Sequence, residues 1–135
     1  MDSSTREEVR KRAGGRCEYC HLPQTCVTTP FQIEHVVARQ HRGRDHLGNL
    51  AYACLRCNLH KGPNLAGIDP ESQTLTRLFN PRRQIWSRHF KWDGALLIGK
   101  TAVGRTTIEV LAMNNPERIA LRQELLDQGL LTEQS

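Results

Sequence analysis

The sequence predicts an α+β fold in which a strand–loop–strand–helix core precedes a C-terminal β-hairpin and helices. Three observations support this class: two CxxC pairs at residues 17–20 and 54–57, strand-like runs between them, and an Asp-Gly turn signal at residues 93–94. A chain of 135 residues suits one domain, or one domain with a C-terminal extension. We expect the core in residues 1–66 and an extension packed on it in residues 67–135.

The composition indicates a modest hydrophobic core. Hydrophobic residues make up 38% of the chain, so part of the fold is expected to need further support, such as a bound metal ion. The net charge of +5 favours polyanionic partners, although many basic proteins bind none. The N-terminal residues are charged throughout, and no apolar run approaches the ~18 residues of a membrane helix. We therefore expect a cytoplasmic protein without a membrane partner.

The first half of the chain contains the elements of the predicted core. They follow in the order helix, strand, strand, helix, at residues 4–13, 31–37, 49–54 and 54–61. Ser4 with Glu7 and Thr5 with Glu8 both have capping-box spacing at the start of the first helix. Gly62 and the proline after it end the last helix. A basic loop, residues 38–49, joins the two strands.

The second half is expected to form the extension. Residues 63–82 are rich in turn formers and are predicted to be irregular. A hairpin is predicted over residues 85–101, then a helix over residues 102–113, and a last helix that begins at Asn115 with proline behind it. The hairpin mixes aromatic and basic residues. Such a mixture fits either stacking on nucleic-acid bases or a hairpin that packs one apolar face inward.

The two CxxC pairs predict a structural zinc site formed by Cys17, Cys20, Cys54 and Cys57. Four thiolates complete the tetrahedral shell of Zn²⁺ and leave no open position for chemistry. The ion would crosslink distant segments and so contribute directly to folding. The competing interpretations, a redox pair or plain burial, suit a single CxxC better than two. Cys26 is not part of a CxxC pair. It is expected to be a spare thiol, although it could stand in for one of the ligands.

The segment between the two CxxC pairs exceeds the ~15–20 residues of simple four-cysteine modules, so it is where the chemistry is to be sought. It contains IEHVV and GNL, and ACLRCNLHKG follows. With CEYC, these motifs resemble the HNH endonucleases of the ββα-metal (His-Me finger) fold, in the order and spacing of that family. The resemblance covers residues 14–63.

The resemblance implies a role for each polar residue of these motifs. His35 corresponds to the general base that activates water, and a neutral imidazole suits that role near pH 7. Asn49 corresponds to the residue that fixes the loop or orients the imidazole. Asn58 corresponds to a ligand of a catalytic Mg²⁺ or Mn²⁺ ion. Glu34, which stands beside the base where the family usually has Asp, corresponds to a second ligand of that ion. His60 is a further candidate ligand, although it lies about 200° around the helix from Asn58.

The substrate implied by the resemblance is DNA, with RNA as the alternative, cut to leave 5′-phosphate and 3′-hydroxyl ends. Arg39, Arg42, Arg44 and Lys61 are the candidate contacts to the nucleic-acid backbone. Lys61 also fits a helix cap, and the three arginines also fit an exposed loop. We expect no small organic cofactor, and no surface for dimerisation is legible in the sequence.

A second function stays open at this point. A zinc-stabilised module could bind nucleic acid, or support another protein, without cutting, and the Glu34 departure and the basic composition fit that alternative. A thiol–disulfide enzyme fits poorly, because no thioredoxin-like βαβ pattern surrounds either CxxC pair.

Overall fold

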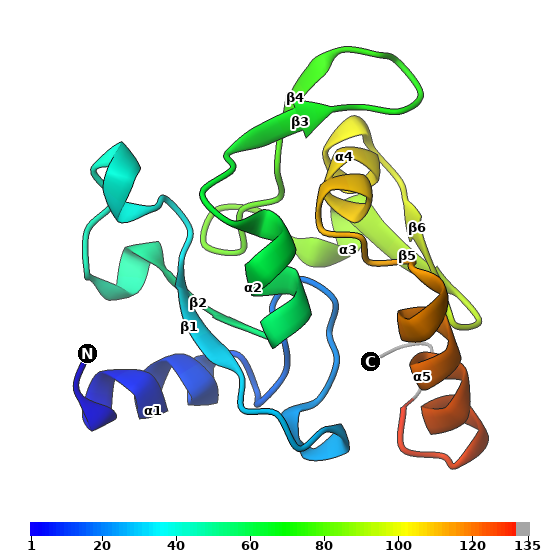
Figure 1. Cartoon of the computed structure of the whole chain (residues 1–135), viewed down its shortest axis with the longest axis horizontal. Coiled ribbons are helices and arrows are strands. Elements are labelled where there is room, and N and C mark those ends of the chain that lie inside the picture. Colours follow the sequence, from blue (N-terminus) through cyan, green and yellow to red (C-terminus); the bar gives the residue numbers. More distant parts are fainter. Residues whose placement is uncertain (132–135) are drawn as a thin grey trace. The chain divides into compact units, whose positions relative to one another are not determined.

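The computed structural model describes residues 1–131, which form short helices and three separate two-stranded sheets (Figure 1). They group into two compact units. Unit 1 comprises Met1–Leu65 and Asn80–Gln84, and unit 2 comprises Ala66–Phe79 and the described residues from Ile85 onward. The α+β class predicted from the sequence is confirmed. The division into residues 1–66 and 67–135 stays a prediction, and its last four residues lie outside the described part.

Unit 1 has a helix, an antiparallel strand pair and a second helix, joined by loops with short 3-10 turns. Its elements are α1 (Ser3–Arg12), η1 (Gln24–Cys26), β1 (Gln32–His35), η2 (Arg39–His41), η3 (Leu47–Asn49), β2 (Leu50–Ala53) and α2 (Leu55–Lys61). β1 pairs with β2 from Gln32 opposite Ala53 to His35 opposite Leu50. α1 packs against β2 and α2 against β1, so the strand pair lies between the helices.

The first helix begins one residue earlier than predicted. Asp2 is its N-cap, and Asp2 Oδ1 accepts a hydrogen bond from Thr5 N at 2.8 Å. Ser4 and Thr5 therefore lie inside the helix, and the capping boxes predicted for them are wrong. Aspartate at the N-cap satisfies a free N–H group as well as serine or threonine does. At the other end, Arg12 donates to Leu50 O at 2.6 Å and so ties the helix to β2.

Unit 2 has two hairpins and three helices. Its elements are β3 (Ala66–Ile68), β4 (Leu75–Arg77), α3 (Trp86–His89), β5 (Phe90–Asp93), β6 (Leu96–Gly99), α4 (Ala102–Val110) and α5 (Pro116–Asp127). The β5–β6 hairpin turns at Gly94, whose φ of +59° suits glycine, as the Asp-Gly signal predicted. Asn115 caps α5 as expected, with its side chain accepting from Arg118 N.

Two features of unit 2 differ from the prediction. Residues 66–77 form the β3–β4 hairpin instead of an irregular segment. Asp69 organises its loop, accepting from Ser72 Oγ at 2.7 Å and from Arg105 Nη2 at 2.9 Å. This contact from a distant helix has no local sequence signal. The start of the predicted hairpin is also wrong, because Trp86–His89 is the helix α3.

The aromatic residues of unit 2 pack on one another. Phe90 is buried, with its ring centroid 5.1 Å from that of Trp86 and 5.3 Å from that of Phe79. Trp92 lies next to Trp86, at 5.9 Å. Of the two interpretations of this aromatic-basic segment, the contacts support internal packing. Across the described residues, no helix combines the length and apolar character needed to cross a membrane.

Candidate functional site

The four predicted zinc ligands lie together in unit 1. Cys17 and Cys20 follow α1, Cys54 is the N-cap of α2, and Cys57 lies in its first turn. All four are buried, and their sulfur atoms lie within 4.8 Å of one another. Cys54 Sγ accepts a hydrogen bond from Cys57 N at 3.4 Å. This N-cap contact fixes the positions of two of the four sulfur ligands relative to α2.

The cluster has the dimensions of a tetrahedral metal site. Zn–S bonds of about 2.3 Å place the sulfur atoms of a Zn²⁺ tetrahedron about 3.8 Å apart, and Cys20 Sγ lies 3.8 Å from Cys54 Sγ. Hydrogen bonds from Cys17 and Cys20 lower the pKa of Cys54, while burial raises that of Cys17. The residues fit a structural metal ion such as zinc. Cys26 is half-buried and lies outside this group, as expected.

Glu34 is enclosed in a buried polar contact. It follows Ile33 on β1, and its carboxylate accepts from Tyr19 Oη at 2.6 Å through Oε2. Oε1 lies 2.6 Å from Nζ of Lys61, close enough for an ion pair, although the direction does not suit a hydrogen bond. Lys61 also donates to Val36 O at 2.9 Å. Burial raises the pKa of Glu34, and the ammonium of Lys61 opposes that shift.

This contact corrects the prediction for Lys61. Only 2% of the residue is exposed, and its ammonium group faces Glu34 and the strand backbone instead of solvent. A phosphate cannot reach it in this arrangement, and it does not cap the helix either. For Glu34, the paired cation already balances the carboxylate, so direct coordination of a divalent ion would require Lys61 to move.

His35 lies at the end of β1 and contacts a carboxylate that the sequence prediction did not include. His35 Nε2 lies 2.6 Å from Asp45 Oδ1, and 18% of the imidazole side chain is exposed. Arg39 donates to both oxygens of Asp45, through Nε at 3.2 Å and through Nη2 at 3.0 Å. The hydrogen bond from His35, with a smaller contribution from Arg39, lowers the pKa of Asp45. Asp45 is therefore a carboxylate at neutral pH.

Asn49 fastens the loop between the strands. Its Oδ1 accepts from Val37 N at 2.9 Å, and its Nδ2 donates to Val37 O at 3.0 Å and to Arg44 O at 2.9 Å. These bonds join the exit of β1 to the residue before Asp45. The arrangement agrees with the loop-fixing role implied for Asn49, and the side chain makes no contact with the imidazole of His35 in the hydrogen bonds of the described residues.

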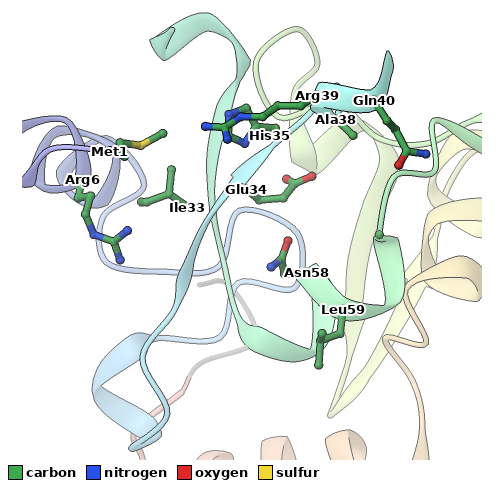
Figure 2. Close-up of a pocket in the computed structure, with 11 residues that line it drawn as sticks. Met1, Arg6, Ile33, Glu34, His35, Ala38, Arg39, Gln40, Asn58 and Leu59 are labelled. Carbon is green, nitrogen blue, oxygen red and sulfur yellow. The ribbon is translucent and has the colours of Figure 1, made fainter. Parts of the chain in front are cut away.

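An open cavity of about 600 Å³ lies between β1 and α2. Glu34, His35, Arg39 and Asn58 are among its lining residues. In Figure 2, Glu34 and Asn58 extend into the space between β1 and α2, and His35 lies beside Arg39. His60 is exposed on α2 and does not line it. The half-turn between Asn58 and His60 thus separates them, as the helical angle predicted.

The predicted backbone-contacting arginines of the loop are exposed. Arg42 and Arg44 reach solvent, and Arg42 has a φ of +67° where the chain turns sharply after η2. Arg39 is also exposed, but two of its nitrogen atoms are engaged with Asp45. Arg42 and Arg44 therefore add exposed positive charge to the loop that follows His35.

Two residues of the site were missing from the prediction. Tyr19 is one of the two residues between the cysteines of CEYC. The neighbouring sequence gives no sign that its hydroxyl would donate to Glu34, so it looks like an ordinary core tyrosine. Asp45 had a usable signal, because it is the single acidic residue of the otherwise basic segment 38–49. A lone carboxylate between a candidate base and Asn49 is a reasonable partner for an imidazole.

Comparison with known proteins agrees with the motifs. A family model described as HNH endonuclease matches residues 17–64, which confirms the resemblance over the zinc knuckles, the strand pair and α2. The Septu protein PtuB of Bacillus thuringiensis is 26% identical over 116 residues, which are 84% of this chain and 42% of that protein. The chain thus spans about two fifths of the length of this relative. No solved structure matches the chain.

Proposed function

We propose that this protein is a metal-dependent HNH endonuclease that hydrolyses phosphodiester bonds of DNA. The observation that supports this most directly is the position of His35, partly exposed in an open cavity with its Nε2 paired to Asp45, inside the segment that matches the HNH endonuclease family. RNA is the alternative substrate.

His35 is the proposed general base. It takes a proton from a water molecule, whose oxygen attacks the phosphorus, and the bond to the 3′ oxygen breaks. The leaving oxygen takes a proton from solvent and becomes the 3′-hydroxyl. Arg42 and Arg44, which are exposed on the loop that follows His35, are the proposed contacts to the flanking phosphates. Asn49 keeps this loop in place.

The donors for a catalytic cation fit only in part. The Asn58 amide lines the cavity and is a suitable oxygen ligand, whereas Glu34 is paired with Lys61 and His60 lies outside the cavity. A Mg²⁺ or Mn²⁺ ion at Asn58 would neutralise charge that develops on the phosphate. We expect water and substrate oxygens to complete its shell.

The Glu34–Lys61 pair favours a second candidate function. Glu34 is the acidic residue among the described residues that line the cavity, and the buried ammonium of Lys61 already balances its carboxylate. A zinc-stabilised module that binds nucleic acid without cutting it needs no free acidic ligand, and the exposed arginines of the loop suffice for it.

Replacement of His35 by Ala distinguishes the two functions. We expect the wild-type protein to nick supercoiled plasmid with Mg²⁺ or Mn²⁺ and not with EDTA, and the variant to lose at least about 10²-fold in rate. Zinc content, measured by mass spectrometry, should be unchanged. His41→Ala is the matched control, because His41 is exposed on the loop and outside the cavity lining. Retarded plasmid mobility without nicking would decide for the binding module, and full activity of the His35 variant would exclude the assigned base.

A further inference from the structure

The carboxylate behind His35 has no role in the function described so far. Asp45 Oδ1 contacts Nε2 of the imidazole at 2.6 Å, while Asp45 is absent from the cavity lining that includes His35. A carboxylate can only accept a hydrogen bond, so in neutral His35 the proton must reside on Nε2. The lone pair is then on Nδ1, the nitrogen that does not face Asp45.

We propose that Asp45 is a positioning residue, which holds His35 in the tautomer and orientation needed to take a proton through Nδ1. The proposal rests on the proposed nuclease function and adds to it the residue that sets up the base. Asp45 would not itself accept the proton. When water gives its proton to Nδ1, the imidazole becomes an imidazolium, and the adjacent carboxylate stabilises that positive charge until the proton passes to solvent.

Asp45 is itself held from two sides. Arg39 donates to both of its oxygens and so fixes the plane of the carboxylate. Asn49 bonds the carbonyl of the preceding residue, Arg44. Gly43 lies so close to Val37, two residues beyond β1, that a Cβ there would overlap the carbonyl oxygen of Val37. The loop is therefore packed onto the end of β1, and a rigid loop can orient a catalytic imidazole.

The charges around the pair agree with this role. The low pKa of Asp45 keeps its carboxylate ionised near neutral pH. Asp45 and Arg39 together are neutral, so the imidazole faces a carboxylate without excess negative charge near the incoming phosphate. The exposed fractions of the two side chains, 56% for Asp45 and 68% for Arg39, indicate that solvent weakens the contact compared with a buried catalytic triad.

The test uses the full-length, zinc-loaded protein and the variant Asp45→Asn. An amide can donate to Nε2 and thereby stabilise the wrong tautomer. We expect kcat for plasmid nicking to fall about 10²-fold with KM within about twofold, because the substrate contacts are intact. Asp127→Asn, an exposed aspartate of α5, should leave both constants unchanged.

A second readout does not depend on activity. In a long-range ¹H–¹⁵N spectrum at pH 8, His35 of the wild-type protein should show a protonated Nε2 and a bare Nδ1, its signals assigned by their loss in His35→Ala. Asp45→Asn should shift His35 toward the other tautomer. An unchanged tautomer, or a changed tautomer with unchanged kcat, would overturn the role of Asp45. If the wild-type protein cuts no nucleic acid, the nuclease function fails, and the positioning role fails with it, whatever the spectrum shows.

Discussion

The two units of this protein differ in what fills their interiors. Unit 1 buries four cysteines and the charged pair Glu34–Lys61 beside its apolar residues. Unit 2 buries aliphatic and aromatic side chains, the Phe79–Phe90 contact among them, together with Asp69 and Arg122. Unit 1 also contains the candidate site. We therefore expect unit 1 to depend on a metal ion and on its matched buried charges. In the described part of unit 2, which has no such cysteine cluster, hydrophobic burial should contribute more.

The largest expected effect is loss of the metal from unit 1. Cys57→Ser removes one of four ligands of a site whose binding free energy, in comparable zinc modules, is on the order of 10 kcal/mol. We expect amides of β1, β2 and α2 to lose hydrogen-exchange protection while amides of unit 2 keep it. Bound zinc, measured by mass spectrometry, should fall from one equivalent per chain to well below it.

Cys26→Ser is the matched control, because Cys26 lies outside the cluster and is only half-buried. It should retain zinc and the protection of unit 1. Equal loss of protection in both units after Cys57→Ser would show that unit 2 needs the metal as well, and would contradict the proposed difference between the units.

Local pattern was enough to predict most of the fold. β1 and β2, the start of α2 and the β5–β6 hairpin follow from alternation, CxxC spacing and an Asp-Gly turn. The β3–β4 hairpin was missed because its register depends on Asp69 and on Arg105 in a distant helix. Exposed strands as short as three residues carry no apolar alternation that could have replaced that information.

The site was predictable to a smaller extent. The family's motifs locate His35, Asn49 and Asn58 in the sequence. In the structure His35 and Asn58 line the same cavity, and Asn49 fastens the loop that follows His35. Motifs do not state which side chain neutralises which, so the burial of Lys61 against Glu34 was missed. Lys61 is the last residue of α2, and a lysine at the end of a short helix is expected at the surface. Tertiary packing alone places its ammonium beside the backbone of Val36.

Lys61→Met tests how much unit 1 depends on its matched charges. The substitution leaves the Glu34 carboxylate buried without its cation, which should lower the free energy of unfolding by about 3–5 kcal/mol, measured by urea denaturation. The double variant Glu34→Gln with Lys61→Met has no charge left at this pair and should recover part of the loss. Lys11→Met, at an exposed position of α1, should change little. Equal losses in the single and double variants would show that packing of Lys61, and not charge balance, stabilises unit 1.

Arg122→Met gives the corresponding and smallest effect, in unit 2. This buried cation donates to the carbonyls of Ala95 and Met113 and to Asn114 Oδ1, and its guanidinium lies 5.2 Å from the Trp92 ring centroid. Methionine cannot donate to these three neutral oxygens. We therefore expect the free energy of unfolding to fall by roughly 2–3 kcal/mol in the same urea measurement. Arg88→Met, an exposed substitution in α3, is the control. The three oxygens named above are neutral, whereas Lys61→Met leaves the Glu34 carboxylate buried beside an apolar side chain, so the loss should be smaller than for Lys61→Met. A larger loss would show that unit 2 depends on its buried cation more than unit 1 does.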